Sequence, residues 1–229
     1  MEDKIMYIPS DRIDEFRGIC DKNADGVTLE EFLDNYDPKT WDNPSATVDT
    51  IVATQDLGKI KKIMLIRRGN HPSIGLWALP GGFVEYRENL KDAALRELSE
   101  ETGIEGIDAV QLKTYGDWDR DPRTRIITTA FASIVDEKDI AFAAGDDAAQ
   151  ADWFSVDIRD NKDGTYDLTL VSDKDKIRLS CTVAEARKDI SGIEERSYKV
   201  VKRDGIAADH GAIILESILI LEDKLKGNR

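Results

Sequence analysis

Apolar and polar positions follow two different periods along the chain, and these periods predict a sheet that is accompanied by helices. Apolar residues alternate with polar ones, or run together, over 45–55, 60–68, 109–115 and 125–135, as is typical of strands. From about Tyr86 to Thr102 the chain is rich in Leu, Ala, Glu, Arg and Lys without an interior Gly or Pro, which predicts a helix. A last helix is predicted over 207–226, where apolar residues occupy more than one face, so we expect it to be heavily buried.

Two segments lie outside this pattern. Residues 1–46 predict a helical N-terminal extension in which Ser10 caps the first helix. We therefore expect the main domain to span 47–229. Within it, 157–205 predicts an insertion that consists of a β-hairpin followed by a short helix from Val183 to about Ile190. The residue types of this insertion indicate no chemistry of their own.

The N-terminal extension contains a stretch with two interpretations. Asp21 to Gly26 resembles the start of an EF-hand calcium loop, but the twelfth position of that loop is Phe32 instead of a bidentate Glu. In the alternative interpretation, the Asp-Gly pair forms a turn, and Thr28 to Glu31 is a capping box that opens the next helix. Both interpretations stay open at this point.

Composition and charge restrict the classes of partner. The formal net charge of −14 argues against nucleic acid or an anionic membrane as the main partner, because phosphate surfaces require compensating Lys and Arg. The longest apolar stretch, 213–221, is interrupted by Glu216 and is too short to span a bilayer. No signal peptide is visible at the start, and Cys20 and Cys181 favour two free thiols in a reducing cytoplasm, with a disulfide as the alternative.

The strongest pattern for chemistry is a glycine turn followed by clustered acids. Gly81 and Gly82 follow an apolar run and free the backbone for a tight turn. On the helix behind them, Glu97, Glu100 and Glu101 are spaced i, i+3 and i+4, so they share one face. Crowded carboxylates repel one another, and a hard divalent cation is the usual reason to hold them together. A solvated acidic face is the alternative.

Further residues stand at fixed offsets from this turn. Arg96 has a planar fork that suits a neighbouring carboxylate and can fix its orientation. Glu88 follows the glycine turn, and Gly103 stands where a helix needs a left-handed terminating residue. These offsets make a chance acidic helix a poor explanation.

The segment from Gly82 to Ile104 resembles a complete Nudix box. It matches at nine positions: Gly82, Glu88, Arg96, Glu97, Leu98, Glu100, Glu101, Gly103 and Ile104. The flanks 63–69 and 75–82 resemble the strands that lead into such a box. On these residues the chain is identified as a member of the Nudix hydrolase family. The resemblance implies an α+β fold, the Nudix α/β/α sandwich, in which a mixed sheet lies between the box helix and the C-terminal helix.

The resemblance also implies roles for these residues. The three helix glutamates and the carbonyl of Gly81 would bind one to three Mg²⁺ ions, with Mn²⁺ able to substitute. One of these carboxylates, or an acid from a loop, would orient or deprotonate the attacking water. Arg96 would position Glu97, and Glu88 would support the geometry of the turn and the helix.

Candidate substrate contacts come from a polar loop at 116–125, which holds three arginines and one Trp. Arginine binds two phosphate oxygens at once, so Arg120, Arg123 and the strand-end Arg68 are candidates for phosphate contact. Trp118 could stack on a base or a ribose. A solvated loop and a solvated strand end are the alternatives. The loop resembles the x-x-R-D-P-R-x-R stretch of Nudix enzymes that act on ADP-ribose and of related transcription regulators.

Two more segments resemble the same subgroup. Residues 145–153 match it, but the subgroup often has Glu where Gln150 stands, so Asp146 and Asp147 become the candidate loop bases. The Asp209-His210 dipeptide resembles an Asp-His pair of the subgroup, and we interpret it as a structural hydrogen-bond pair, with a catalytic role as the alternative. The subgroup also implies a homodimer.

The expected function is hydrolysis of ADP-ribose to AMP and ribose 5-phosphate. Nucleotide sugars, dinucleotide polyphosphates, NADH and oxidised nucleoside triphosphates are alternative substrates, because the box reads only the diphosphate. A ligand-sensing transcription regulator is another alternative. Such regulators carry a winged helix-turn-helix after the Asp-His helix. We expect no such DNA-binding domain here, because the chain ends at Arg229 and the surface is acidic. A calcium-responsive interaction protein built on 10–36 and a catalytically inactive binding module complete the alternatives.

Overall fold

The computed structural model describes residues 10–17, 19–37, 43–140, 151–172, 174 and 176–227. The chain divides into two compact units, with the division between Asn43 and Pro44. No helix in these described ranges is both long and apolar enough to cross a membrane.

The N-terminal unit contains the 3-10 helix η1 (Ser10–Phe16) and the short helix α1 (Leu29–Asn35). A capping box opens α1, because the Glu31 N–H donates to Thr28 Oγ1 over 3.2 Å and the Thr28 N–H donates to Glu31 Oε2 over 2.9 Å. The Asn23 side chain accepts two backbone N–H groups and holds the preceding turn. The capping-box interpretation is therefore confirmed, and calcium binding at this turn stays an untested alternative.

The second unit is built on one mixed sheet, which has ten strands within the described residues. These strands are β1 (Ser45–Asp56), β2 (Lys59–Arg67), β3 (Trp77–Ala78), β4 (Gly81–Phe83), β5 (Val110–Tyr115), β6 (Ile126–Ile134), β7 (Ala151–Asp160), β8 (Thr165–Ser172), β9 (Ile177–Ile190) and β10 (Ile193–Asp204). The order along the sheet is β10-β9-β8-β7-β2-β1-β6-β5, and β3 and β4 pair with β2 and β1. The β1–β6 pair is parallel, and the other pairs are antiparallel.

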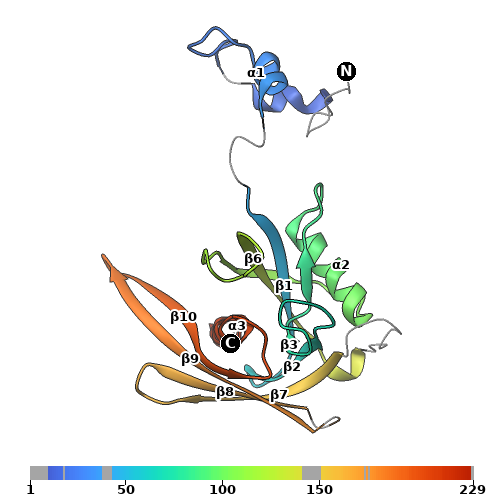
Figure 1. The fold of residues 1–229 in the computed structure, drawn as a ribbon, viewed down its shortest axis with the longest axis vertical. Coiled ribbons are helices and arrows are strands. Elements are labelled where there is room, and N and C mark those ends of the chain that lie inside the picture. The colour runs from blue at the N-terminus through green and yellow to red at the C-terminus, as the bar shows by residue number, and fades with distance from the viewer. Residues whose placement is uncertain are drawn as a thin grey trace. The chain divides into compact units, whose positions relative to one another are not determined.

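Two helices, α2 (Leu90–Thr102) and α3 (His210–Gly227), cover the sheet, and the 3-10 turn η2 (Glu137–Asp139) follows β6. Figure 1 shows α3 inside the curve of the sheet and α2 on the other side of β1. Successive side chains of β1 point to opposite faces of the sheet, which explains this arrangement. Val48 and Val52 pack in the clusters that contain residues of α2. Ile51 and Ala53 pack in the cluster that contains residues of α3. The predicted α+β sandwich is thus confirmed.

The C-terminal helix is buried on nearly all sides over its first half, as its broad apolar stripe predicts. It also buries two acids, which the sheet neutralises. Lys113 on β5 pairs with Glu216, and Lys59 on β2 pairs with Glu222. These pairs tie α3 to two separated strands.

The predicted helix from Val183 to Ile190 is wrong, because these residues form the second half of β9. Their Ala, Glu, Arg and Lys content favours a helix, but Val183 is fully buried and pairs with Tyr166 on β8 and with Val200 on β10. Burial and pairing on both sides therefore override local propensity. The segment beyond 157 continues the central sheet as an antiparallel meander of four strands, β7 to β10, and β10 was not predicted.

Candidate active site

The glycine turn lies on the short strand β4, which pairs with β1. A Cβ atom on Gly81 would lie 2.0 Å from the carbonyl oxygen of Val48. A Cβ atom on Gly82 would lie 2.4 Å from the carboxylate of Glu97. Gly81 therefore requires glycine because it packs closely against backbone atoms, whereas a side chain at Gly82 would displace the carboxylate of Glu97, one of the predicted site glutamates.

The box helix α2 begins at Leu90, after the N-cap Asn89, and not at the predicted position near Tyr86. Its end is as predicted, since Gly103 has φ 71° and ψ 7° and its N–H donates to the carbonyl of Ser99. The residues between β4 and α2 therefore form a loop, and Glu88 lies in this loop instead of on the helix.

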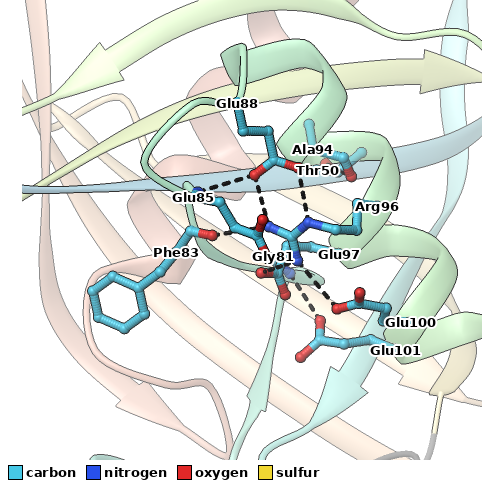
Figure 2. Close-up of polar contacts among 10 residues, drawn as sticks. All are labelled: Thr50, Gly81, Phe83, Glu85, Glu88, Ala94, Arg96, Glu97, Glu100 and Glu101. Atoms are coloured by element: carbon cyan, nitrogen blue, oxygen red, sulfur yellow. Dashed lines mark hydrogen bonds and ion pairs between the residues drawn. The ribbon is translucent and has the colours of Figure 1, made fainter. Parts of the chain in front are cut away.

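Arg96 is the centre of a polar network (Figure 2). Its guanidinium donates to both carboxylate oxygens of Glu88 over 2.8 and 2.9 Å, and to the carbonyl of Phe83 over 3.0 Å. The same group donates to Glu97 over 2.8 Å and to Glu100 over 3.1 Å, so the predicted contact between Arg96 and Glu97 is present. Its hydrogen bonds hold the pKa of Glu88 below its usual range. One cation thus joins the loop, the strand β4 and the helix.

Glu101 points away from this network and toward β4. It accepts the backbone N–H of Gly81 over 2.8 Å (Figure 2). Burial is the main reason why its pKa rises to about 7, and the negative charges of Glu97 and Asp49 raise it further, whereas the Gly81 hydrogen bond and Arg68 lower it. Burial and two neighbouring carboxylates thus both disfavour the charged form of Glu101.

Within the described residues, no three side chains of His, Cys, Asp or Glu are arranged so that they could hold a metal ion as they stand. Glu97 and Glu100 instead contact Arg96. The donor set nevertheless suits a hard cation, because the acids are oxygen ligands and Glu101 is buried beside like charges. Glu100 has a side chain that is 59% exposed, so it can turn from Arg96 toward a bound ion.

A cavity of about 260 Å³ lies beside β4, and we call it the glutamate cavity. The residues that line it include Gly81, Gly82, Glu101 and three predicted substrate contacts: Arg68, Arg120 and Arg123. The fold thus brings these arginines to the box although they are distant in sequence. Trp118 is 80% exposed and lines no part of this cavity. Asp146 and Asp147 lie outside the described residues, so their role as loop bases stays a prediction.

Each of the three arginines is held in place by a neighbour. Arg120 donates to both oxygens of Asp209 over 2.9 and 3.2 Å. Arg123 donates to Asp121 and lies 5.3 Å from the ring centroid of Phe83. Arg68 donates to the carbonyl of Pro72 over 2.8 Å. Such contacts leave less side-chain freedom to be lost when a phosphate binds.

Asp209 and His210 do not pair with each other, in contrast to the structural pair that the sequence suggests. Asp209 binds Arg120, whereas Nδ1 of His210 accepts the Leu79 N–H over 3.2 Å. The same nitrogen lies 4.0 Å from a carboxylate oxygen of Asp49. His210 therefore positions the chain just before the glycine turn.

Sequence reasoning missed Asp49, an acid in the cavity wall. This residue is buried on β1, and it accepts a hydrogen bond of 2.6 Å from Thr128 on β6. The available signal was a charged residue among the buried apolar positions of a strand. With Glu101 it makes the floor of the cavity negative.

Comparisons with known proteins agree with this geometry. The family model of the NUDIX domain matches residues 44–167. The ADP-ribose pyrophosphatase of Methanocaldococcus jannaschii is 41% identical over 114 residues, which are 50% of this chain and 63% of that protein. The ADPR responsive transcriptional repressor NtrR of Acinetobacter baylyi is 37% identical over 111 residues, which are 48% of this chain and 44% of that protein. The matched part thus spans less than two thirds of either relative.

Among solved structures, the crystal structure of a MutT/nudix family protein from Enterococcus faecalis is similar with a TM-score of 0.61 and 29% identity. The similarity covers 83% of this chain and 68% of that chain. It therefore extends beyond the 44–167 match into the later strands or α3. The family model covers more than half of the sequence, and the chain belongs to the NUDIX domain family.

Proposed function

We propose that this protein is a Mg²⁺-dependent hydrolase that cleaves the pyrophosphate bond of a nucleoside diphosphate derivative. The best candidate reaction is the cleavage of ADP-ribose to AMP and ribose 5-phosphate. One observation carries the proposal: the box residues Gly81, Gly82 and Glu101 share a cavity with Arg68, Arg120 and Arg123. Acids for a cation and arginines for phosphate oxygens are the two requirements of a diphosphate site.

The chain's own residues divide this work. A diphosphate resists attack because its negative oxygens repel a nucleophile, and the guanidinium groups of Arg120 and Arg123 offset that charge and orient the phosphates. Arg96 and Glu88 hold the loop between β4 and α2 against the helix, which keeps Glu97 at the turn. One of the box glutamates, or Asp146 or Asp147, would take the proton of the attacking water.

The proposed ligands for the metal are Glu97, Glu100, Glu101 and the carbonyl of Gly81. Bound there, Mg²⁺ or Mn²⁺ would neutralise phosphate charge and lower the pKa of a coordinated water. The raised pKa of Glu101 and its like-charged neighbours support this assignment, since a cation would relieve the repulsion.

A second candidate function is ADP-ribose sensing without turnover. It is favoured by the similarity to the ADPR responsive repressor of Acinetobacter baylyi. The same cavity would then bind the diphosphate, and binding would change contacts elsewhere. Hydrolysis of the bound ADP-ribose distinguishes the two functions, because only the enzyme releases product.

The test is a hydrolysis panel with purified protein, with and without MgCl₂. It covers ADP-ribose, dinucleotide polyphosphates, NADH, nucleotide sugars and oxidised nucleoside triphosphates. We expect release of AMP and ribose 5-phosphate from ADP-ribose, and loss of that release when a chelator removes the metal. Tight ADP-ribose binding without any product would support the sensing function instead. Consumption of no substrate and no binding would overturn both.

We further propose a homodimer located in the cytoplasm. Support for the dimer comes only from the resemblance to the ADP-ribose subgroup, and the free thiols of Cys20 and Cys181 agree with a reducing compartment. Light scattering coupled to gel filtration tests the dimer, and a mass of one chain at working concentration would contradict it.

A further inference from the structure

A second cavity, of about 500 Å³, adjoins the glutamate cavity. The two have six lining residues in common: Pro72, Ser73, Arg120, Asp121, Ala208 and Asp209. A wall of the second cavity is β10, which lies beyond the 44–167 match of the family model. The hairpin of β9 and β10 extends past the rest of the sheet (Figure 1). This wall therefore lies outside the residues that the family model matches.

The Arg120–Asp209 pair lines both cavities and lies where they meet. Arg120 comes from the loop between β5 and β6, and its side chain is only 9% exposed, while Asp209 directly precedes α3. A bidentate pair between two such elements has a fixed geometry. A diphosphate that lies beside Glu101 and reaches Arg120 would thus direct its next substituent into the second cavity.

The charges of the second cavity exclude a further phosphate group. Lys113 pairs with Glu216, Arg120 pairs with Asp209, and Asp121 is neutralised by Arg123. The charged side chains that remain on its wall are Lys199, Arg203, Asp117 and Asp119, so positive and negative charges balance. A polyanion requires surplus positive charge, whereas a sugar or a nucleoside requires mixed polar groups beside apolar surface.

The apolar surface and one fixed ring come from β10 and α3. Tyr198 and Val200 of β10 face this cavity together with Ile213 of α3. The hydroxyl of Tyr198 donates to Glu185 over 3.0 Å, and the carboxylate of Glu185 is itself bound by Arg187. The Tyr198 ring is therefore held in place and offers a flat surface to a sugar or a base.

We propose that the second cavity binds the uncharged sugar or nucleoside attached to one side of the diphosphate, and that β10 selects for substrates with such a group. The inference rests on the proposed function, because it takes the diphosphate to lie in the glutamate cavity. The favoured substrates are then diphosphates that carry a bulky neutral group on each end. Nucleoside triphosphates, which place a charged phosphate there, are disfavoured.

The test compares Tyr198→Ala with Tyr166→Ala as the matched control. Tyr166 lies on β8, which β9 separates from β10, with its ring centroid 6.4 Å from that of Tyr198, but it does not line the cavity. Calorimetry measures the binding of the two half-products, AMP and ribose 5-phosphate, to each protein. Steady-state kinetics measures kcat and KM for ADP-ribose and for ATP.

We expect Tyr198→Ala to weaken the binding of one half-product roughly tenfold and to leave the other unchanged, as is usual when a buried tyrosine contact is removed. The KM for ADP-ribose should rise more than kcat falls, and the preference for ADP-ribose over ATP should drop by about the same factor. The Tyr166→Ala variant should match the wild type in all these measurements.

Equal binding of both half-products by Tyr198→Ala and by the wild type would overturn the inference, even if ADP-ribose is hydrolysed. A loss of half-product binding in a protein that hydrolyses nothing would keep the inference and refute the proposed hydrolase. Thermal melts of each variant report on folding. If Tyr198→Ala does not fold, Arg203→Ala with Lys202→Ala as its control examines the same wall, since Arg203 lines the cavity and Lys202 does not.

Discussion

The two ends of the joined cavities are built in different ways. The glutamate end comes mainly from Gly81 to Glu101, a continuous segment of turn and helix whose Glu101 lines the cavity together with Asp49 of β1. The arginine end comes from segments far apart in sequence: Arg120 from a loop, Tyr198 from β10 and Asp209 at the start of α3. The first end depends on local geometry, whereas the second exists only when the sheet and α3 are assembled.

This difference predicts two kinds of response to substitution. Changes at the glutamate end should alter chemistry while the fold persists, because Glu100 is exposed and adds little to packing. Changes at the arginine end should alter binding and stability together, because Arg120 and Asp209 also link a loop to α3. The following predictions test this contrast.

The largest effect is expected for Glu100→Gln, with Glu105→Gln as the control. Glu105 is exposed beyond the end of α2, so its substitution removes a charge but no proposed metal ligand. The Glu100 variant should lose kcat on the order of a hundredfold or more, because loss of a metal ligand removes several kcal/mol of transition-state stabilisation. Assays at matched Mg²⁺ check this, and wild-type turnover would refute the metal assignment.

The next effect concerns stability and pH in metal-free protein. The pKa of Glu101 is raised from 4.5 to about 7, so the folded chain binds this proton more tightly than the unfolded chain. The contribution to the free energy of unfolding is present below pH 4.5 and is lost as the pH rises to 7, on the order of 3 kcal/mol. The free energy of unfolding of the Glu101→Gln variant should not show this decrease between pH 4.5 and pH 7.

Urea unfolding of both proteins at pH 4.5 and pH 7.5, in the presence of a chelator, measures the difference. Equal pH dependence in the wild type and in Glu101→Gln would contradict the raised pKa. Addition of Mg²⁺ at the higher pH should stabilise the wild type more than the variant, because a ligand that binds the folded state raises its stability.

At the arginine end, Arg120→Ala should both destabilise the protein and weaken substrate binding. It leaves Asp209 without its partner, which costs about 1.5–3 kcal/mol for a charged hydrogen-bonded pair. We expect the KM for ADP-ribose to rise by roughly tenfold or more, as loss of such a contact implies. The control is Arg125→Ala, since Arg125 is exposed at the end of the same loop and lines neither cavity.

Thermal melts and steady-state kinetics on both arginine variants test this prediction. The contrast between the two ends would fail if Arg120→Ala lowered kcat but left both the melting temperature and KM unchanged.

The smallest effect is a difference in reactivity between the two free thiols. Burial raises the pKa of Cys181 on β9 to about 11, so little thiolate exists at pH 8. The Sγ atom of Cys181 lies 2.4 Å from where a Cβ of Gly211 would be, which places it beneath the start of α3. A thiol reagent at pH 8 should therefore modify the exposed Cys20 quickly and Cys181 slowly.

Counting of modified thiols over time checks this result, and the Cys20→Ser variant should lose the fast phase. Two thiols that react equally fast in the folded protein would show that α3 opens readily over β9. The arginine end would then be less fixed than its contacts indicate.

The glutamate end could be predicted from sequence because its geometry is local. Three and four residue spacings on a helix place Glu97, Glu100 and Glu101 on one face, and Gly103 ends that helix in the left-handed region. The hydrogen-bond partner of Glu101 could not be predicted in the same way. The N–H of Gly81 reaches this carboxylate only because β4 pairs with β1, which the local pattern does not specify.

In the later part of the chain, local sequence predicted the wrong secondary structure. The residues from Val183 to Ile190 have helix-forming composition, yet strand pairing with β8 and β10 makes them part of β9. Whether such a segment forms a helix or a strand depends on which other elements bury it and pair with it, and the local sequence does not contain that information. The second cavity has β10, the partner of this strand, as a wall, and it could not be predicted.

The sequence by itself determined the box helix and its glycine turn, because periodicity and spacing act over a few residues, and the resemblance of this segment to the Nudix box implied the sandwich and the family. Only the tertiary structure decided which arginine meets Asp209, where Asp49 lies, and that β10 forms a wall of the second cavity. These facts depend on strand order and on the packing of α3, which bring together residues more than 80 positions apart, such as Arg120 and Asp209. Contacts over such separations arise from the burial of the whole core, and no local pattern encodes them.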